Sequence, residues 1–138
     1  MNIDETISTG KQYMTWLVAG VGGLTAIVTI YEIINWQSST LLIIQLIAAT
    51  FLMCSLLLVM RGFPLRWAAF GLLMLSGLIA FYLGGSRMGN FELGEVTLSS
   101  YLSVGAGLAY LFSAIYYSYS PEIGAYLRTQ AAIRKKTT

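Results

Sequence analysis

Four long runs of apolar residues, separated by short polar breaks, organise this sequence. The runs cover residues 14–36, 40–60, 65–85 and 96–119. A helix needs about 20 apolar residues to cross about 30 Å of hydrocarbon, so each run is close to that length or above it. The runs show no alternation of period two, and a backbone in lipid must satisfy its own hydrogen bonds. The pattern therefore predicts four transmembrane helices.

The breaks between the runs carry turn and helix-start signals. Gly62, Phe63 and Pro64 separate the second and third runs. Proline is favoured at the first position of a helix, where its missing N–H costs nothing. We therefore expect a tight turn, followed by a helix that opens at Pro64 or Leu65. Glycines within 84–94 predict a looser connection between the third and fourth runs.

A further helix start follows the fourth run. Ser120 fits an N-cap, Pro121 fits the first helical position, and Glu122 fits the electropositive first turn. These signals predict a short amphipathic helix over about 121–133. Such a helix would lie in the headgroup plane and attract anionic lipid; a disordered basic tail is the alternative. The apolar side of the predicted helix consists of Ile123, Tyr126 and Leu127.

These elements predict the fold class: an all-α integral membrane protein, built as a four-helix up-down-up-down transmembrane bundle with a short C-terminal amphipathic helix. Residues 1–138 form a single transmembrane domain, of which 120–138 is a cytoplasmic tail. The composition agrees, because 57% of the residues are hydrophobic and only 10% are charged, against about 25% in soluble domains. The mean hydropathy of +0.71 is too high for a water-soluble globule.

The basic residues predict the orientation of the bundle. With four spans, the N-terminal segment, the second turn and the C-terminal tail share one side of the membrane. They hold every Lys and Arg except Arg87. The positive-inside rule then places both termini in the cytoplasm, and the plasma (inner) membrane is the expected location. The first run is too long for the apolar region of a cleavable signal peptide, so we expect it to be a permanent anchor.

Small and polar residues form stripes that should face other helices, because helices in lipid associate through close packing and polar contacts. One face of the first helix reads Thr15, Ala19, Gly22, Thr25, Thr29, Glu32 and Trp36. The opposite face is bulky and should contact lipid: Leu17, Val21, Leu24, Val28 and Tyr31. The fourth helix has a stripe of Ser99, Ser103, Ala106, Tyr110, Ser113 and Tyr117. The residues expected to mediate helix–helix packing are Gly22, Thr25, Thr29, Ser99, Ser103 and Ala106.

Aromatic residues gather at the ends of the predicted spans, which is typical of anchoring at a membrane interface. At the cytoplasmic interface we place Tyr13, Trp16, Trp67, Tyr116, Tyr117 and Tyr119. At the outer interface we place Tyr31, Trp36 and Tyr82. We interpret these residues as an anchoring belt rather than as a surface on which a ligand stacks.

Glu32 is the one acidic residue within the predicted spans. It lies one helical turn before Trp36, roughly 6 Å below the outer boundary at the helical rise. Gln45 and Arg87 reach a similar depth on their own helices, so the three side chains are expected to meet. One interpretation, which we favour, is a structural pair between Glu32 and Arg87. The other is an outward-facing ion or proton site, in which Glu32 titrates and its two neighbours tune its pKa.

Little else in the chain could carry chemistry. There is no histidine, and the single cysteine, Cys54, is interpreted as a small packing residue. Histidine-based haem and metal sites, histidine acid–base catalysis and intrachain disulfides are therefore excluded. No nucleotide-binding loop, nucleophile elbow, CxxC or HExxH motif occurs. We expect no enzyme activity, no cofactor, no metal and no nucleic-acid partner.

The expected function is that of a small non-catalytic accessory or structural subunit of a larger membrane protein complex. Its partners would be the lipid bilayer, other membrane subunits or further copies of itself, and anionic lipid at the basic tail. Two alternatives stay open. One is a homo-oligomeric channel or small transporter with an outward-facing site at Glu32; the other is a membrane-active or immunity-type membrane protein.

Overall fold

Five helices make up the described part of the chain. The computed structural model describes residues 2–35, 39–89 and 98–137, without the side chains of 32, 35, 39–42, 45, 83, 86–89, 98 and 99. The helices are α1 (Ile3–Asn35), α2 (Ser39–Met60), α3 (Arg66–Gly89), α4 (Leu98–Tyr119) and α5 (Pro121–Thr137). The described residues form no strand, so the predicted all-α class is confirmed.

The first and last helices are longer than the sequence pattern predicts. α1 begins at Ile3, well before the first apolar run, with Asp4 and Glu5 in its first turn. Acidic side chains stabilise the positive end of a helix, and the Glu5 carboxylate accepts a hydrogen bond from the backbone N–H of Asn2 at 3.2 Å. α5 continues to Thr137, with three basic residues in its last turn, where they complement the negative end. The alternative of a disordered tail is therefore wrong for residues 121–137.

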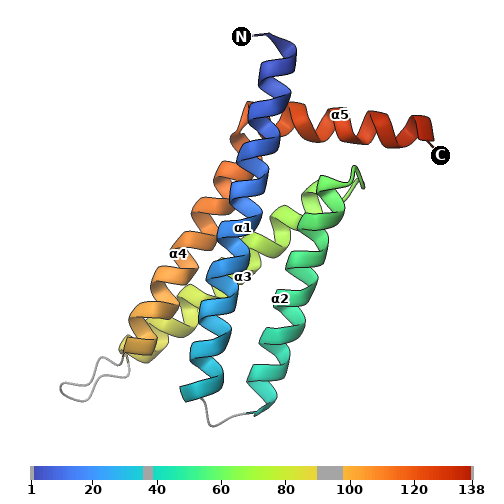
Figure 1. Ribbon diagram of the computed structural model, residues 1–138. Helices are drawn as coiled ribbons and strands as arrows, with labels where there is room; N and C mark the ends of the chain where they lie inside the picture. Colours follow the sequence, from blue (N-terminus) through green and yellow to red (C-terminus); the bar gives the residue numbers. More distant parts are fainter. Residues whose placement is uncertain (1, 36–38, 90–97, 138) are drawn as a thin grey trace.

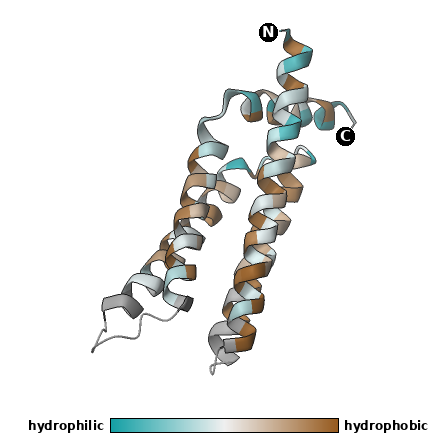
Figure 2. Cartoon of the chain, turned by 60° about the vertical axis from the view of Figure 1, so that its left-hand side comes forward, coloured by the Kyte–Doolittle hydropathy of each residue, from teal (hydrophilic) through white to brown (hydrophobic). Residues whose placement is uncertain are grey.

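Helices α1 to α4 run in alternating directions, so the start of α1, the α2–α3 turn and α5 lie at the same end of the bundle (Figure 1). We call this end the capped end. α5 crosses it at a steep angle to α1, from the end of α4 toward the α2–α3 turn. Figure 2 shows hydrophilic residues gathered at the capped end and hydrophobic residues along the helices beyond it.

A glycine in the left-handed conformation ends α2. Gly62 has φ +84°, its N–H donates to the carbonyl of Val59 at 3.0 Å, and the Phe63 N–H donates to the carbonyl of Leu58 at 3.1 Å. These two bonds define a Schellman cap, which satisfies carbonyls that the end of the helix leaves open. The tight turn predicted at Gly62–Pro64 is present, and α3 follows with Arg66 as its first residue.

Glycines bring α3 and α4 into backbone contact. A Cβ atom added at Gly107 would lie 2.6 Å from the Phe81 backbone nitrogen and 2.8 Å from the Gly77 carbonyl oxygen. A Cβ at Gly84 would lie 2.7 Å from the Val104 backbone nitrogen. Distances below 3.0 Å leave no room for a side chain, so these glycines set the separation of the two helices.

In its first half α1 packs inward with a different side from the predicted one, whereas Thr25 and Thr29 of the predicted stripe are buried. Leu17 and Val21, expected to face lipid, are 9% and 2% exposed, whereas Thr15 and Ala19 are exposed. The cause is α5, which the sequence pattern did not dock against α1. Gly10 faces α5, and the same side of the helix continues through Leu17 and Val21 into the core. The largest fully buried side chains are Tyr117, Met14, Leu52, Leu56, Leu73 and Ile123.

Large apolar side chains cover the outside of the bundle. Ile27, Phe51, Leu78 and Phe112 are between 53% and 68% exposed, and each belongs to a different helix from α1 to α4. Among the described residues, one stretch of helix, Ile3–Tyr31, is long and apolar enough to cross a membrane, and only 17% of its most apolar window is buried. Shorter apolar stretches are Leu46–Met60 and Arg66–Tyr82.

Gly107→Ala is expected to destabilise the protein by about 1–3 kcal/mol, the usual cost of overpacking, because its methyl group would push α3 away from α4. Gly105→Ala is the matched control, since a Cβ there meets nothing within 4 Å. In a helix interior that exchange is neutral or stabilising by up to about 1 kcal/mol. Thermal unfolding in detergent micelles measures both variants. Equal midpoints for Gly107→Ala and Gly105→Ala would show that the helices do not touch there.

Candidate functional site

The polar constellation predicted at the outer end falls mostly outside the described side chains. Glu32, Gln45 and Arg87 belong to α1, α2 and α3, toward the end of the bundle opposite the cap (Figure 1). Their side chains are not among the described ones, and neither is that of Ser99. The structural pair and the ion or proton site therefore both stay predictions.

The packing residues whose side chains are described are buried or half-buried. The Thr25 hydroxyl donates to the Val21 carbonyl at 2.7 Å and lies 2.6 Å from the Tyr110 hydroxyl. Since the single hydroxyl proton of Thr25 is used on Val21, Tyr110 donates to Thr25 and links α4 to α1. Thr29, Ser103 and Ala106 are buried. Gly22 is half-buried, and a Cβ there would lie 3.1 Å from the Met53 methyl group of α2.

The start of α5 has the predicted cap. The Ser120 hydroxyl oxygen accepts a hydrogen bond from the Ile123 N–H at 3.4 Å and donates to the Glu122 carboxylate at 2.9 Å. Pro121 is the first helical residue. Because only Ser120 separates α4 from α5, the chain turns sharply here, and α5 is directed across the bundle rather than away from it.

The apolar side of α5 faces protein. Ile123, Tyr126 and Leu127 are 0%, 5% and 6% exposed. The apolar side of α5 is therefore covered by the chain itself, and the position of the helix in the headgroup plane stays a prediction. The sequence pattern could not distinguish the two environments, because an amphipathic helix buries the same side against either a membrane or a protein.

Two glycines allow α5 to dock. A Cβ at Gly10 of α1 would overlap the Glu122 carbonyl oxygen and lie 2.9 Å from the Tyr126 Cβ. A Cβ at Gly62 would lie 2.5 Å from the Gln130 carbonyl oxygen. The backbone of α5 therefore rests on glycines at two places, and neither position has room for a methyl group.

Tyr126 of α5 contacts both α1 and α2. Its hydroxyl donates to the Met60 carbonyl of α2 at 3.5 Å, while its Cβ lies beside Gly10 of α1. Burial raises the pKa of the Tyr126 hydroxyl. The hydroxyl therefore stays protonated, as a donor must be, throughout the neutral pH range.

Arg66 and Tyr117 join the start of α3 to the end of α4. The Arg66 guanidinium donates to the Ser118 carbonyl at 3.1 Å, and the Tyr117 hydroxyl donates to the Arg66 carbonyl at 3.3 Å. A cation is favourable at the C-terminal end of a helix, where carbonyls lack intrahelical partners. Tyr117 is fully buried, so its assignment to the interfacial belt is wrong. Trp16, Trp67, Tyr82 and Tyr119 are well exposed.

The basic end of α5 lies over the α2–α3 turn. The Arg134 guanidinium carbon is 3.0 Å from the centre of the Phe63 ring, a cation–π arrangement. Lys135 and Lys136 are exposed beyond it. This contact and the one at Gly62 place the cationic end of α5 beside the end of α2.

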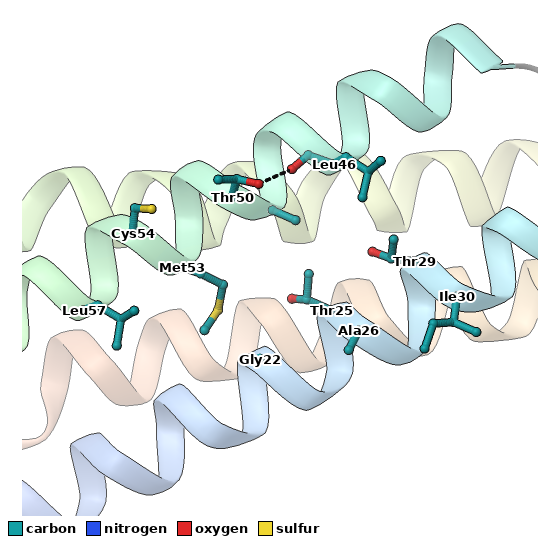
Figure 3. A pocket seen from close by; sticks show the side chains of 11 residues that line it. Gly22, Thr25, Ala26, Thr29, Ile30, Leu46, Thr50, Met53, Cys54 and Leu57 are labelled. Carbon is teal, nitrogen blue, oxygen red and sulfur yellow. Dashed lines mark hydrogen bonds between the residues drawn. The ribbon is translucent and has the colours of Figure 1, made fainter.

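A groove of about 450 Å³ runs between α1 and α2 on the open side of the bundle. Figure 3 shows Thr25 and Thr29 directed from α1 toward α2, and Met53 and Leu57 directed from α2 toward α1. The hydroxyls of Thr25 and Thr50 donate to carbonyls of their own helices. Cys54 is exposed and lines the groove, so it is not the packing residue that we expected. The other lining residues are Gly22, Ala26, Ile30, Leu46 and Ala49.

The described residues were also searched for metal-binding clusters. Among the described side chains no three His, Cys, Asp or Glu residues lie close enough together to hold a metal ion. The chain matches no protein-family model, no curated protein and no solved structure in the three comparisons made. Its function must therefore be argued from its own surfaces.

The residues that the sequence reasoning missed are mainly glycines. Gly10 and Gly107 lie inside helices, where glycine usually weakens the helix and so needs a packing reason. The unfavourable helix propensity of glycine was therefore the sequence signal that could have identified Gly10 and Gly107 as packing residues. Nothing in the local sequence identified the partner backbone, because the contacts join residues far apart in the chain.

Gly10→Ala is expected to release α5 from α1, because its methyl group would meet a carbonyl oxygen and a Cβ of α5 rather than a flexible side-chain end. Gly20→Ala on the same helix is the matched control, since a Cβ there has open space. Limited proteolysis in detergent measures the release. We expect trypsin to cut Gly10→Ala at Arg128 at least several-fold faster than the wild type and Gly20→Ala. Unchanged cleavage at Arg128 would contradict the docking.

Proposed function

We propose that this chain is a small non-catalytic membrane protein with four spans, α1 to α4, and that it acts as a subunit which packs against another membrane helix through the outer face of α1. The exposed apolar side chains on all four helices support the four spans. Contiguous apolar surface of this extent is unusual on a soluble monomer. The single candidate span found by length and composition is the first of the four.

The observation that carries the proposal is the small-residue surface on the outside of α1. Ala19 and Gly23 are exposed, and a Cβ added at Gly23 meets nothing within 4 Å. Elsewhere in the chain small residues on these helices serve close packing, as Gly77 and Gly107 do. Two small residues that are four positions apart in a membrane helix allow a second helix to approach closely. Ala19 and Gly23 have this spacing, and both are exposed on the outside of the helix.

The orientation with both termini in the cytoplasm belongs to the same proposal. The capped end carries Lys11, Arg61, Arg66 and the basic residues of α5. The positive-inside rule assigns such an end to the cytoplasm. The plasma (inner) membrane stays the proposed location.

Gly23→Leu is expected to release the partner helix, because a leucine would hold the two backbones apart. Overpacking of about 1–3 kcal/mol corresponds to roughly a tenfold loss of association or more. The measurement is quantitative co-purification from native membranes in mild detergent, with the mass of the complex determined by light scattering. Gly71→Leu on α3 is the control, since Gly71 is also exposed and unobstructed.

The polypeptides that co-purify with the protein show whether its partner is a different protein or a second copy of itself. Different polypeptides lost only from Gly23→Leu identify a heteromeric subunit, and a homo-oligomer that falls to the monomer identifies self-association through α1. A complex that survives Gly23→Leu unchanged would refute the interface.

A further inference from the structure

We propose that the α1–α2 groove holds an acyl chain of an anionic phospholipid from the cytoplasmic leaflet, with its phosphate at Lys11 and Arg61. This site rests on the proposed membrane insertion but not on the proposed partner helix. It is also distinct from the basic tail, because Lys11 belongs to α1 and Arg61 directly follows α2.

The interior of the groove suits a hydrocarbon chain. Its lining is almost entirely carbon, and the hydroxyls of Thr25 and Thr50 donate to carbonyls of their own helices. A polar ligand would find little there to bind. The groove opens along its length (Figure 3), and its volume of about 450 Å³ is in the range of ligand sites in proteins.

The length of the groove matches one leaflet. Its lining on α2 extends from Leu46 to Leu57. At about 1.5 Å per residue this segment is roughly 16 Å long, about half of a 30 Å hydrocarbon layer. Leu57 is at the end nearer the capped end, so a chain entering there would lie along α2 as far as Leu46.

Two exposed cations stand at the entrance. Arg61 follows Leu57 by four residues and so lies above it on the same face of α2. Lys11 precedes Gly22 by three helical turns on the groove side of α1. The charges are thus in register with the groove on both of its walls, and neither helix carries an acidic residue between its charge and the groove.

Tyr126 brings the two cations to the same level. It contacts Gly10, the neighbour of Lys11, and its hydroxyl bonds to the carbonyl of Met60, the neighbour of Arg61. A phosphate between the two walls would therefore lie beneath α5, at the headgroup level of the proposed orientation. Basic residues at that level attract anionic headgroups, and a single acyl chain alone would be held less selectively.

The test uses the purified full chain in liposomes that contain a trace of phosphatidylglycerol carrying a photoreactive group at the end of one acyl chain. Matching phosphatidylcholine serves as the neutral probe. Cross-linked residues are mapped by mass spectrometry. We expect phosphatidylglycerol to label the α1 and α2 segments around Ile30 and Leu46 several-fold more than phosphatidylcholine does. An excess of unlabelled phosphatidylglycerol should compete better than unlabelled phosphatidylcholine.

Two kinds of variant separate the parts of the site. Ala26→Phe fills the groove and should abolish the localised labelling by both lipids, whereas Gly71→Phe on the outside of α3 should not. Lys11→Gln with Arg61→Gln should lower phosphatidylglycerol labelling by about fivefold for each charge removed and leave phosphatidylcholine labelling unchanged. Lys135→Gln with Lys136→Gln should have no effect, because those charges belong to the tail.

The results that overturn the inference are equal labelling by the two lipids, labelling spread evenly over all four helices, or cross-links from the groove to a second polypeptide. If Ala26→Phe fails to fold, competition by the two unlabelled lipids in the wild-type protein still tests the site. If the lipid site fails while Gly23→Leu still releases its partner, only this inference falls. If the chain does not enter liposomes at all, the proposed membrane insertion falls with it.

Discussion

The backbone of α5 rests directly on two glycines, Gly10 of α1 and Gly62 of the α2–α3 turn, and the arrangement of the capped end depends on these contacts. Neither position has room for a Cβ. Gly62 in addition needs its positive φ to end α2. The α5 helix can therefore lie across the bundle close enough to bury Ile123 and Tyr126. Their burial supplies the hydrophobic stabilisation that holds the helix there, since a short helix alone is marginal in water.

The same docking explains how α1 is rotated. With Gly10 against α5, the side of α1 that carries Leu17 and Val21 turns into the core, and the small residues Ala19 and Gly23 turn outward. The α3–α4 pair is closed by backbone contact at Gly107, whereas α1 and α2 leave a groove between them. One pair of helices is thus packed internally, and the other presents the surfaces on which both proposals rest.

The sequence was informative about elements and less so about contacts. Apolar run length predicted α2, α3 and α4 within a few residues, because their boundaries are marked by Gly62, Pro64 and Pro121. The start of α1 was missed because its polar first turns carry no apolar period. Tyr117 was assigned to an interface and is buried, since the position of a residue along a helix does not reveal a bond to the distant Arg66. The proposed lipid site combines Lys11 and Arg61, which are fifty residues apart in the sequence. Only the folded structure brings them to the same height along the bundle.

Hydrogen–deuterium exchange of the chain in lipid nanodiscs tests the docking of α5 most directly. An undocked helix of 17 residues in water opens readily, so its amides exchange fast even if it is transiently helical. Docking on Gly10 and Gly62 predicts that the amides of residues 124–130 exchange as slowly as those in the capped-end half of α4. Exchange should quicken only toward Lys136. Fast exchange along the whole of α5, with α3 and α4 still protected, would contradict the account.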